Sequence, residues 1–208
     1  MKIKTPYFII EFEIIFLIVF FSFILSNEIK KILFSFYLCY LFIIFHELSH
    51  MLIGVIFGKE IKIFKFTLSG VNISFSNSYM LNKFKEILIY LAGPISNIFL
   101  AIIFSYNKMI FEINICLAII NLLPIFPLDG YNIIYNLLRD TKLEKSRKCI
   151  LKILYIVIFT LLILLAIIEL FMYKNISILI FLIYIILIYF KSNNIKNNTN
   201  IDRICILK

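Results

Sequence analysis

Long apolar runs separated by short polar stretches make up most of the chain. Most runs are close to the roughly 20 residues that a membrane-spanning helix needs, although the second is longer and the last is shorter. The runs lie at residues 8–26, 32–58, 87–106, 109–128, 153–173 and 176–190. The pattern therefore predicts an all-α polytopic membrane protein with six transmembrane helices.

Two polar segments predict further structure. Between the second and third runs, apolar and polar residues alternate on both sides of Ser69 and Gly70. A period of two around such a turn predicts a small β-hairpin between spans 2 and 3. In the second segment, Tyr131, Ile134 and Leu138 have the spacing of one helix face.

Composition and charge support the membrane assignment and set its orientation. The chain is 62% hydrophobic, which is too apolar for a soluble domain. Its 21 basic residues against 12 acidic ones fall mainly in alternate loops rather than on one continuous surface. By the positive-inside rule, both termini and the hairpin are cytoplasmic. The lipid bilayer is the expected partner of these residues, and nucleic acid is excluded.

The domain organisation follows from the same runs. Residues 1–190 form one six-span membrane domain, because no stretch is long enough for a separate soluble domain. Residues 191–208 form a short, basic, Asn-rich cytoplasmic tail that we expect to be disordered.

Both histidines of the chain lie in the sequence His46-Glu47-Leu48-Ser49-His50, inside the second apolar run. On a helix, residues i and i+4 share a face, so His46 and His50 can bind one Zn²⁺ while Glu47 serves as general base. An acidic residue at the centre of a span costs about 2.5–3.5 kcal/mol, which favours a functional reason for it. The alternative is that these side chains are only hydrogen-bonded between helices.

A catalytic zinc ion needs a third protein ligand, and Asp129 is the best candidate. It follows Pro124 and Pro127 at the cytoplasmic end of the fourth run, where two prolines prevent a regular helix. Irregular backbone at membrane depth is tolerated where it lines a cavity, and such a segment can carry the carboxylate inward. The alternative is an interfacial Asp-Gly turn.

Three motifs resemble the site-2 protease class of intramembrane zinc metalloproteases, and within it the stage IV sporulation protein FB type. They are His46 to His50 (HELSH), Ala92 to Asn97 (AGPISN) and Asn121 to Gly130 (NLLPIFPLDG). The order and separation of the motifs are also similar, and the resemblance covers residues 1–190. Where the family motif usually continues Asp-Gly-Gly, this chain has Tyr131 after Gly130.

The resemblance implies that His46, His50 and Asp129 bind Zn²⁺ and that Glu47 activates water. It also implies that Asn97 and Asn121 hold the substrate backbone or the oxyanion, although each side chain can instead satisfy a helix carbonyl. The implied substrate is a membrane-tethered regulatory protein or precursor, such as a sporulation sigma-factor precursor, which the hairpin can receive by strand addition.

The implied location is a bacterial cell membrane, for example the mother-cell membrane around the forespore, with membrane inhibitory or regulatory proteins as further partners. The 18 residues after the last run are too few for the CBS domain that this type commonly adds. Two other classes stay open. A non-catalytic membrane scaffold of the same fold has no need of Glu47, and a metal transporter requires a second set of ligands along its path.

Overall fold

The computed structural model describes residues 2–4, 9–12, 27–67, 70–75, 81–174, 182–183 and 186. The described part of the chain forms two compact units, and the boundary between them lies between Asn121 and Leu122. Residues 13–26 of the first predicted span and the predicted tail at 191–208 lie outside the described residues. Of the predicted span at 176–190, the described positions 182–183 and 186 are helical.

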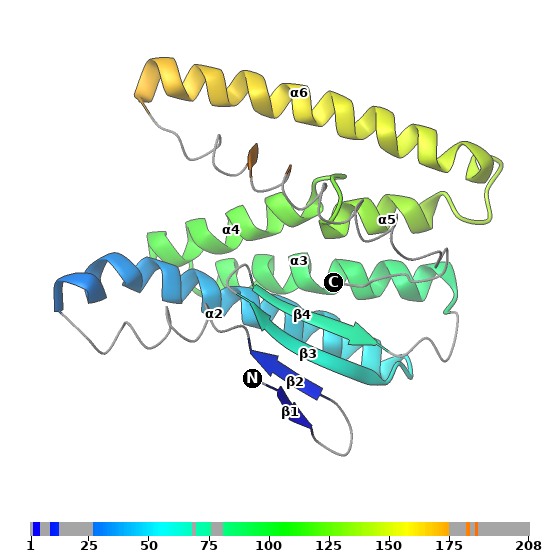
Figure 1. Cartoon of the computed structure of the whole chain (residues 1–208), viewed down its shortest axis with the longest axis horizontal. Helices are drawn as coiled ribbons and strands as arrows, with labels where there is room; N and C mark the ends of the chain where they lie inside the picture. The colour runs from blue at the N-terminus through cyan, green and yellow to red at the C-terminus, as the bar shows by residue number, and fades with distance from the viewer. Residues whose placement is uncertain are drawn as a thin grey trace. The chain divides into compact units, whose positions relative to one another are not determined.

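Two long helices, α2 (Asn27–Ile56) and α3 (Lys83–Ile103), lie side by side in the first unit (Figure 1). A helix bonds its backbone groups internally, as a bilayer requires. The segments Tyr37–Ile56 and Lys83–Ile103 are long and apolar enough to cross a membrane. This outcome confirms helices at the second and third predicted spans.

The first unit also contains a four-stranded sheet with the order β1-β2-β3-β4. Its strands are β1 (Lys2–Lys4), β2 (Ile9–Phe12), β3 (Ile61–Thr67) and β4 (Gly70–Phe75). β3 and β4 pair antiparallel with Thr67 opposite Gly70, which confirms the predicted hairpin. β2 pairs parallel to β3 and antiparallel to β1. The prediction of a transmembrane helix beginning at residue 8 is therefore wrong for residues 9–12, and the sheet is larger than a hairpin.

The hairpin is fixed to the helices at one corner. The ring of Phe75, the last residue of β4, packs where α2 has Gly54, and a Cβ at Gly54 would lie 2.6 Å from Phe75 Cζ. The ammonium of Lys59 lies 5.5 Å from the centre of the same ring and 3.0 Å from Glu86 Oε1 on α3. The Lys59 and Glu86 side chains are only 10% and 14% exposed, so this ion pair is largely shielded from water.

α4 (Lys108–Leu122) is the last helix that begins in the first unit, and its 15 residues are fewer than a full span needs. The sequence predicts a span at 109–128 with irregular backbone near its end, and the chain does leave the helix after Leu122. Pro124 and Pro127 explain the break, because each lacks an N–H and disfavours helix before it.

The second unit contains α5 (Asp129–Leu137), the 3-10 turn η1 (Glu144–Ser146) and α6 (Arg147–Tyr173). α5 confirms the helical spacing predicted around Tyr131, and α6 covers the predicted span at 153–173. Among the described residues, Glu144–Met172 is the third segment long and apolar enough to cross a membrane.

Candidate metal centre

The two histidines lie one turn apart on α2 and are both buried. His46 is 4% exposed and His50 is 8% exposed. Their rings meet edge to face, with centroids 4.7 Å apart and an interplanar angle of 84°. The predicted i, i+4 pair is therefore on one face of the helix, directed at α3 rather than at the surrounding solvent or lipid.

Each imidazole uses its Nδ1 to contact an oxygen atom. Nδ1 of His50 lies 2.6 Å from the backbone oxygen of Ile89, and Nδ1 of His46 lies 2.6 Å from Oδ1 of Asn97. A carbonyl oxygen only accepts hydrogen bonds, so both Nδ1 atoms carry the proton and donate. In neutral rings this leaves the lone pair of each histidine on Nε2.

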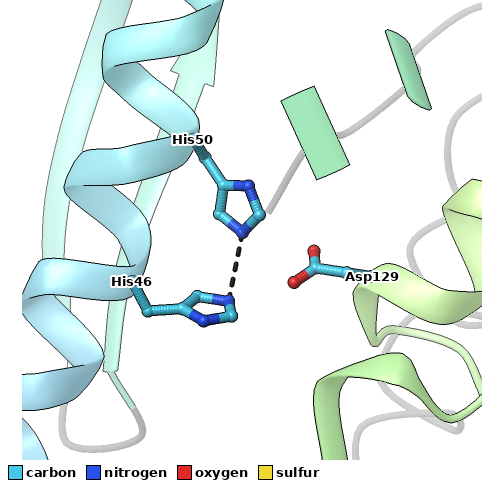
Figure 2. Close-up of side chains that lie close together, drawn as sticks. All are labelled: His46, His50 and Asp129. Atoms are coloured by element: carbon cyan, nitrogen blue, oxygen red, sulfur yellow. Dashed lines mark hydrogen bonds between the residues drawn. The ribbon is translucent and has the colours of Figure 1, made fainter. Parts of the chain in front are cut away.

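The two Nε2 atoms lie 3.1 Å apart and are joined by the dashed line in Figure 2. Two lone pairs that face each other at this distance repel unless a proton or a cation is shared between them. Imidazole nitrogens held in this way, with Nδ1 bonded to an oxygen, are typical of metal ligands.

Gly93 on α3 makes room for the two rings. A Cβ built on Gly93 would touch His50 Nε2 and would lie 2.6 Å from His46 Nε2 and from His46 Cε1. No larger residue fits there without displacing the imidazoles, so the absence of a side chain at Gly93 is what allows the two Nε2 atoms to share one space.

Asn97 lies one turn further along α3 and is completely buried. Its Oδ1 contacts His46, and its Nδ2 donates to Oδ1 of Asn114 on α4 at 3.2 Å. Asn114, also completely buried, donates from its own Nδ2 to the backbone oxygen of Ile110 at 2.9 Å. A row of hydrogen bonds thus extends from α4 through α3 to the histidine on α2.

Asp129 is the first residue of α5 and belongs to the second unit. The irregular segment before it is closed by a hydrogen bond from the Leu128 N–H to the Ile125 oxygen. Gly130 allows this turn to be tight, because a Cβ there would run into the carbonyl of Leu122 and would lie 2.6 Å from the oxygen of Leu123. Tyr131 stacks on Tyr135 and meets the ring of Phe126 edge to face.

The other predicted site residues are placed as follows. Glu47 is half-buried on α2 beside His46. Asn121 is half-buried near the end of α4, where its Nδ2 donates to the Leu117 oxygen one turn back. The structure thus brings His46, His50 and Asn97 together in the first unit. Substrate or oxyanion binding by Asn97 and Asn121 stays a prediction, and the amide groups of both have partners within the protein.

Gly93 and Asn114 are the residues of this site that sequence reasoning missed. Gly93 belongs to the AGPISN motif, but nothing in that motif indicates that the glycine lies against the two histidine rings. Asn114 is a lone amide between Ile113 and Ile115, which was the one signal available for it.

Two comparisons with known proteins found a similarity. Residues 105–165 match the sequence profile of peptidase family M50. The fold is similar to that of the site-2 protease from Methanocaldococcus jannaschii, with a TM-score of 0.58 and 20% sequence identity over 89% of this chain and 91% of that one. A search of curated proteins gave no significant match.

The family match falls on α4, the irregular segment, α5 and most of α6, and the shared fold extends over most of the chain. The profile match relates residues 105–165 to peptidase family M50, and the structural similarity shows that the chain shares the fold of that site-2 protease. This shared fold is consistent with the three described segments that are long and apolar enough to cross a membrane.

Proposed function

We propose that this protein is an intramembrane zinc metalloendopeptidase in which His46, His50 and Asp129 bind the metal ion. The observation that carries the proposal is the pair of buried Nε2 atoms, 3.1 Å apart, on two histidines whose Nδ1 atoms are each engaged by an oxygen. A metal ion bound by both nitrogens would remove the repulsion of the lone pairs.

The donor set fits zinc. The proposed ligands His46, His50 and Asp129, whose side chains are drawn in Figure 2, supply two imidazoles and one carboxylate. Three such ligands are the usual set of a catalytic zinc site, in which the fourth position takes water or substrate. The proposal that Asp129 is the third ligand rests on this chemistry and on its place after the Pro-rich segment.

A zinc ion held by His46, His50 and Asp129 would lower the pKa of its bound water toward about 7 and would polarise the carbonyl of the scissile bond. Glu47, next to His46 on α2, accepts the proton that water loses as its oxygen attacks the carbonyl carbon. Glu47 then gives this proton to the nitrogen of the leaving amine as the C–N bond breaks. The products are a carboxyl and an amino terminus, so one water molecule is consumed for each bond cleaved.

The proposed substrate is a membrane-tethered regulatory protein or precursor, with sporulation sigma-factor precursors as one candidate group. A helical substrate must unwind before attack, since its amides are bonded internally. β4 supports this idea because it pairs only with β3 among the described strands, so its other edge is able to accept an extended segment. The proposed setting is a bacterial cell membrane with both termini in the cytoplasm.

The first test is the metal content of detergent-purified protein. Wild type and Glu47→Gln are expected to hold about one zinc per chain, and His46→Ala and Asp129→Ala to lose it. Metal analysis by mass spectrometry also tells zinc from other first-row metals, several of which accept the same ligands.

Two matched control variants distinguish the loss of a metal ligand from a general loss of folded structure. Ser49 lies between the histidines on α2, and its hydroxyl donates to the Phe45 oxygen of the same helix at 2.8 Å. Ser49→Ala is therefore expected to keep zinc. Glu112→Gln removes an exposed carboxylate of α4 and is expected to keep zinc as well. Zinc retained by Asp129→Ala would assign the third ligand to another residue.

Activity is the second test. A panel of membrane-anchored reporter proteins is co-expressed with wild type or Glu47→Gln, and cleavage is followed by a change in the reporter's size. The proposal expects cleavage by wild type alone. Zinc bound without cleavage of any reporter by either protein would favour the scaffold, and zinc carried into sealed vesicles would favour the transporter.

A further inference from the structure

A row of three hydrogen bonds connects His46 of α2 to a backbone carbonyl of α4. The backbone oxygen of Ile110 only accepts, so Asn114 must present its NH₂ group there, at 2.9 Å. Its Oδ1 then faces α3, and Asn97 must present its own NH₂ group to it, at 3.2 Å. What remains for His46 is Oδ1 of Asn97, at 2.6 Å, which accepts a proton from Nδ1.

The backbone carbonyl of Ile110 on α4 therefore determines which group donates and which accepts in each hydrogen bond of this row. Both asparagines are completely buried, so water does not compete for their amides. His50 differs, because its Nδ1 contacts the backbone oxygen of Ile89 directly and needs no side chain to set its tautomer.

We infer that Asn114 is a positioning residue, which through Asn97 holds His46 in the Nδ1–H tautomer and so directs the Nε2 lone pair at the metal. This inference deepens the proposed function, since the tautomer serves a metal ligand. Asn114 does not contact the metal, the water or the substrate in this role. It acts by removing the freedom of the Asn97 amide to rotate by 180° and offer NH₂ to His46.

Removing the Asn114 amide undoes this constraint. In Asn114→Leu, which is close in size, Asn97 has no acceptor to orient it, and both of its amide orientations become open. When NH₂ faces His46, Nδ1 must accept, the proton moves to Nε2, and the metal loses that lone pair. Loss of an outer partner of this kind typically weakens metal binding about 10- to 100-fold.

The decisive measurement is the ¹⁵N NMR spectrum of histidine-labelled protein, stripped of metal by chelation, at one fixed pH. The chain has only two histidines, so His50→Gln identifies the signals of His46. In wild type we expect a protonated Nδ1 and an unprotonated Nε2 at His46. Asn114→Leu should show a second His46 population with these states exchanged, and zinc titration should give a dissociation constant about 10- to 100-fold higher.

Two further variants sharpen the test. Asn136→Leu is the matched control, because Asn136 is also a buried helical asparagine that donates to the oxygen one turn back, at 2.9 Å, but on α5. It should leave the His46 signals and the zinc affinity unchanged. Asn114→Asp in its protonated form donates its O–H to the Ile110 oxygen and keeps a carbonyl acceptor for Asn97, so it should retain the wild-type tautomer.

Several outcomes overturn the inference. A His46 signal that stays wholly Nδ1–H in Asn114→Leu would show that Asn97 needs no orienting partner. An unprotonated His46 Nδ1 in wild type would show that the row does not hold the Nδ1–H tautomer. This second measurement needs only the wild-type protein, so it tests the inference even if Asn114→Leu does not fold. Failure of the proposed function looks different, because the metal-free spectra would be as expected while wild type binds no zinc.

Discussion

Gly93 of α3 lies directly against the imidazole of His50 on α2, so close that even one methyl group on Gly93 would overlap Nε2 of the ring. The contact explains why two long apolar helices can pack with a pair of polar rings between them. It also makes the backbone of α3 one wall of the candidate metal site.

Gly93→Ala is expected to abolish or strongly weaken zinc binding while leaving the protein folded. The new Cβ must push both rings aside, and a shift of this kind separates Nε2 from the position it needs. Isothermal titration with zinc should show at least a tenfold loss of affinity, by analogy with the loss of other groups around a metal.

Gly58→Ala is the control for this change. A Cβ at Gly58 meets no atom within 4 Å, but the residue has φ of +86°. The substitution should lower the free energy of unfolding by about 1 kcal/mol through backbone strain and leave zinc affinity unchanged. Equal zinc affinities for Gly93→Ala and wild type would contradict the assigned contact.

Glu86→Gln is expected to lower the free energy of unfolding by about 1–3 kcal/mol, because it leaves the shielded ammonium of Lys59 without its charged partner. Denaturant unfolding in detergent measures the change. Glu112→Gln, which removes the exposed pair with Lys108, should cost less than about 0.5 kcal/mol. Similar costs for both variants would mean that the Lys59 pair is solvated.

Gly130→Ala is expected to destabilise the turn between α4 and α5 by about 1–3 kcal/mol, since the Cβ meets backbone carbonyls that cannot rotate away. Gly54→Ala is the matched substitution, because its Cβ meets the outer edge of the Phe75 ring, which can move. Thermal unfolding should show the larger loss for Gly130→Ala. The reverse order would contradict the description of this turn.

Tyr135→Phe and Tyr135→Ala separate two contacts of Arg147 at the start of α6. The guanidinium lies 3.7 Å from the Tyr135 ring centre and donates to its hydroxyl at 2.8 Å. Tyr135→Phe loses only the hydrogen bond, worth about 0.5–1.5 kcal/mol. Tyr135→Ala also loses the stacking of the ring on Arg147 and on Tyr131, and should cost a further 0.5–2 kcal/mol or so in the unfolding free energy. Equal costs would mean that the stacking adds nothing.

Local patterns in the sequence predicted the parts of this protein that local forces determine. The spacing of His46 and His50 follows from helix periodicity alone, and the break after Leu122 follows from the missing N–H groups of two prolines. Both were therefore predictable, as was the hairpin around Gly70.

Features that depend on distant packing were not predictable. Residues 9–12 carry three apolar side chains and were assigned to a span, because a short apolar run does not distinguish a strand from a helix. Their strand conformation depends on β3, about fifty residues later. Asn114 is likewise uninformative until α3 brings Asn97 beside it.

The parallel pairing of β2 with β3 has a consequence for how the chain is threaded. A bilayer cannot pass through a hydrogen-bonded sheet, so Ile9–Phe12 and Ile61–Thr67 share one aqueous side. The number of crossings between Phe12 and Ile61 is therefore even, and Tyr37–Ile56 on its own would make it odd. The sheet thus limits the membrane topologies that the N-terminal part of the chain can adopt.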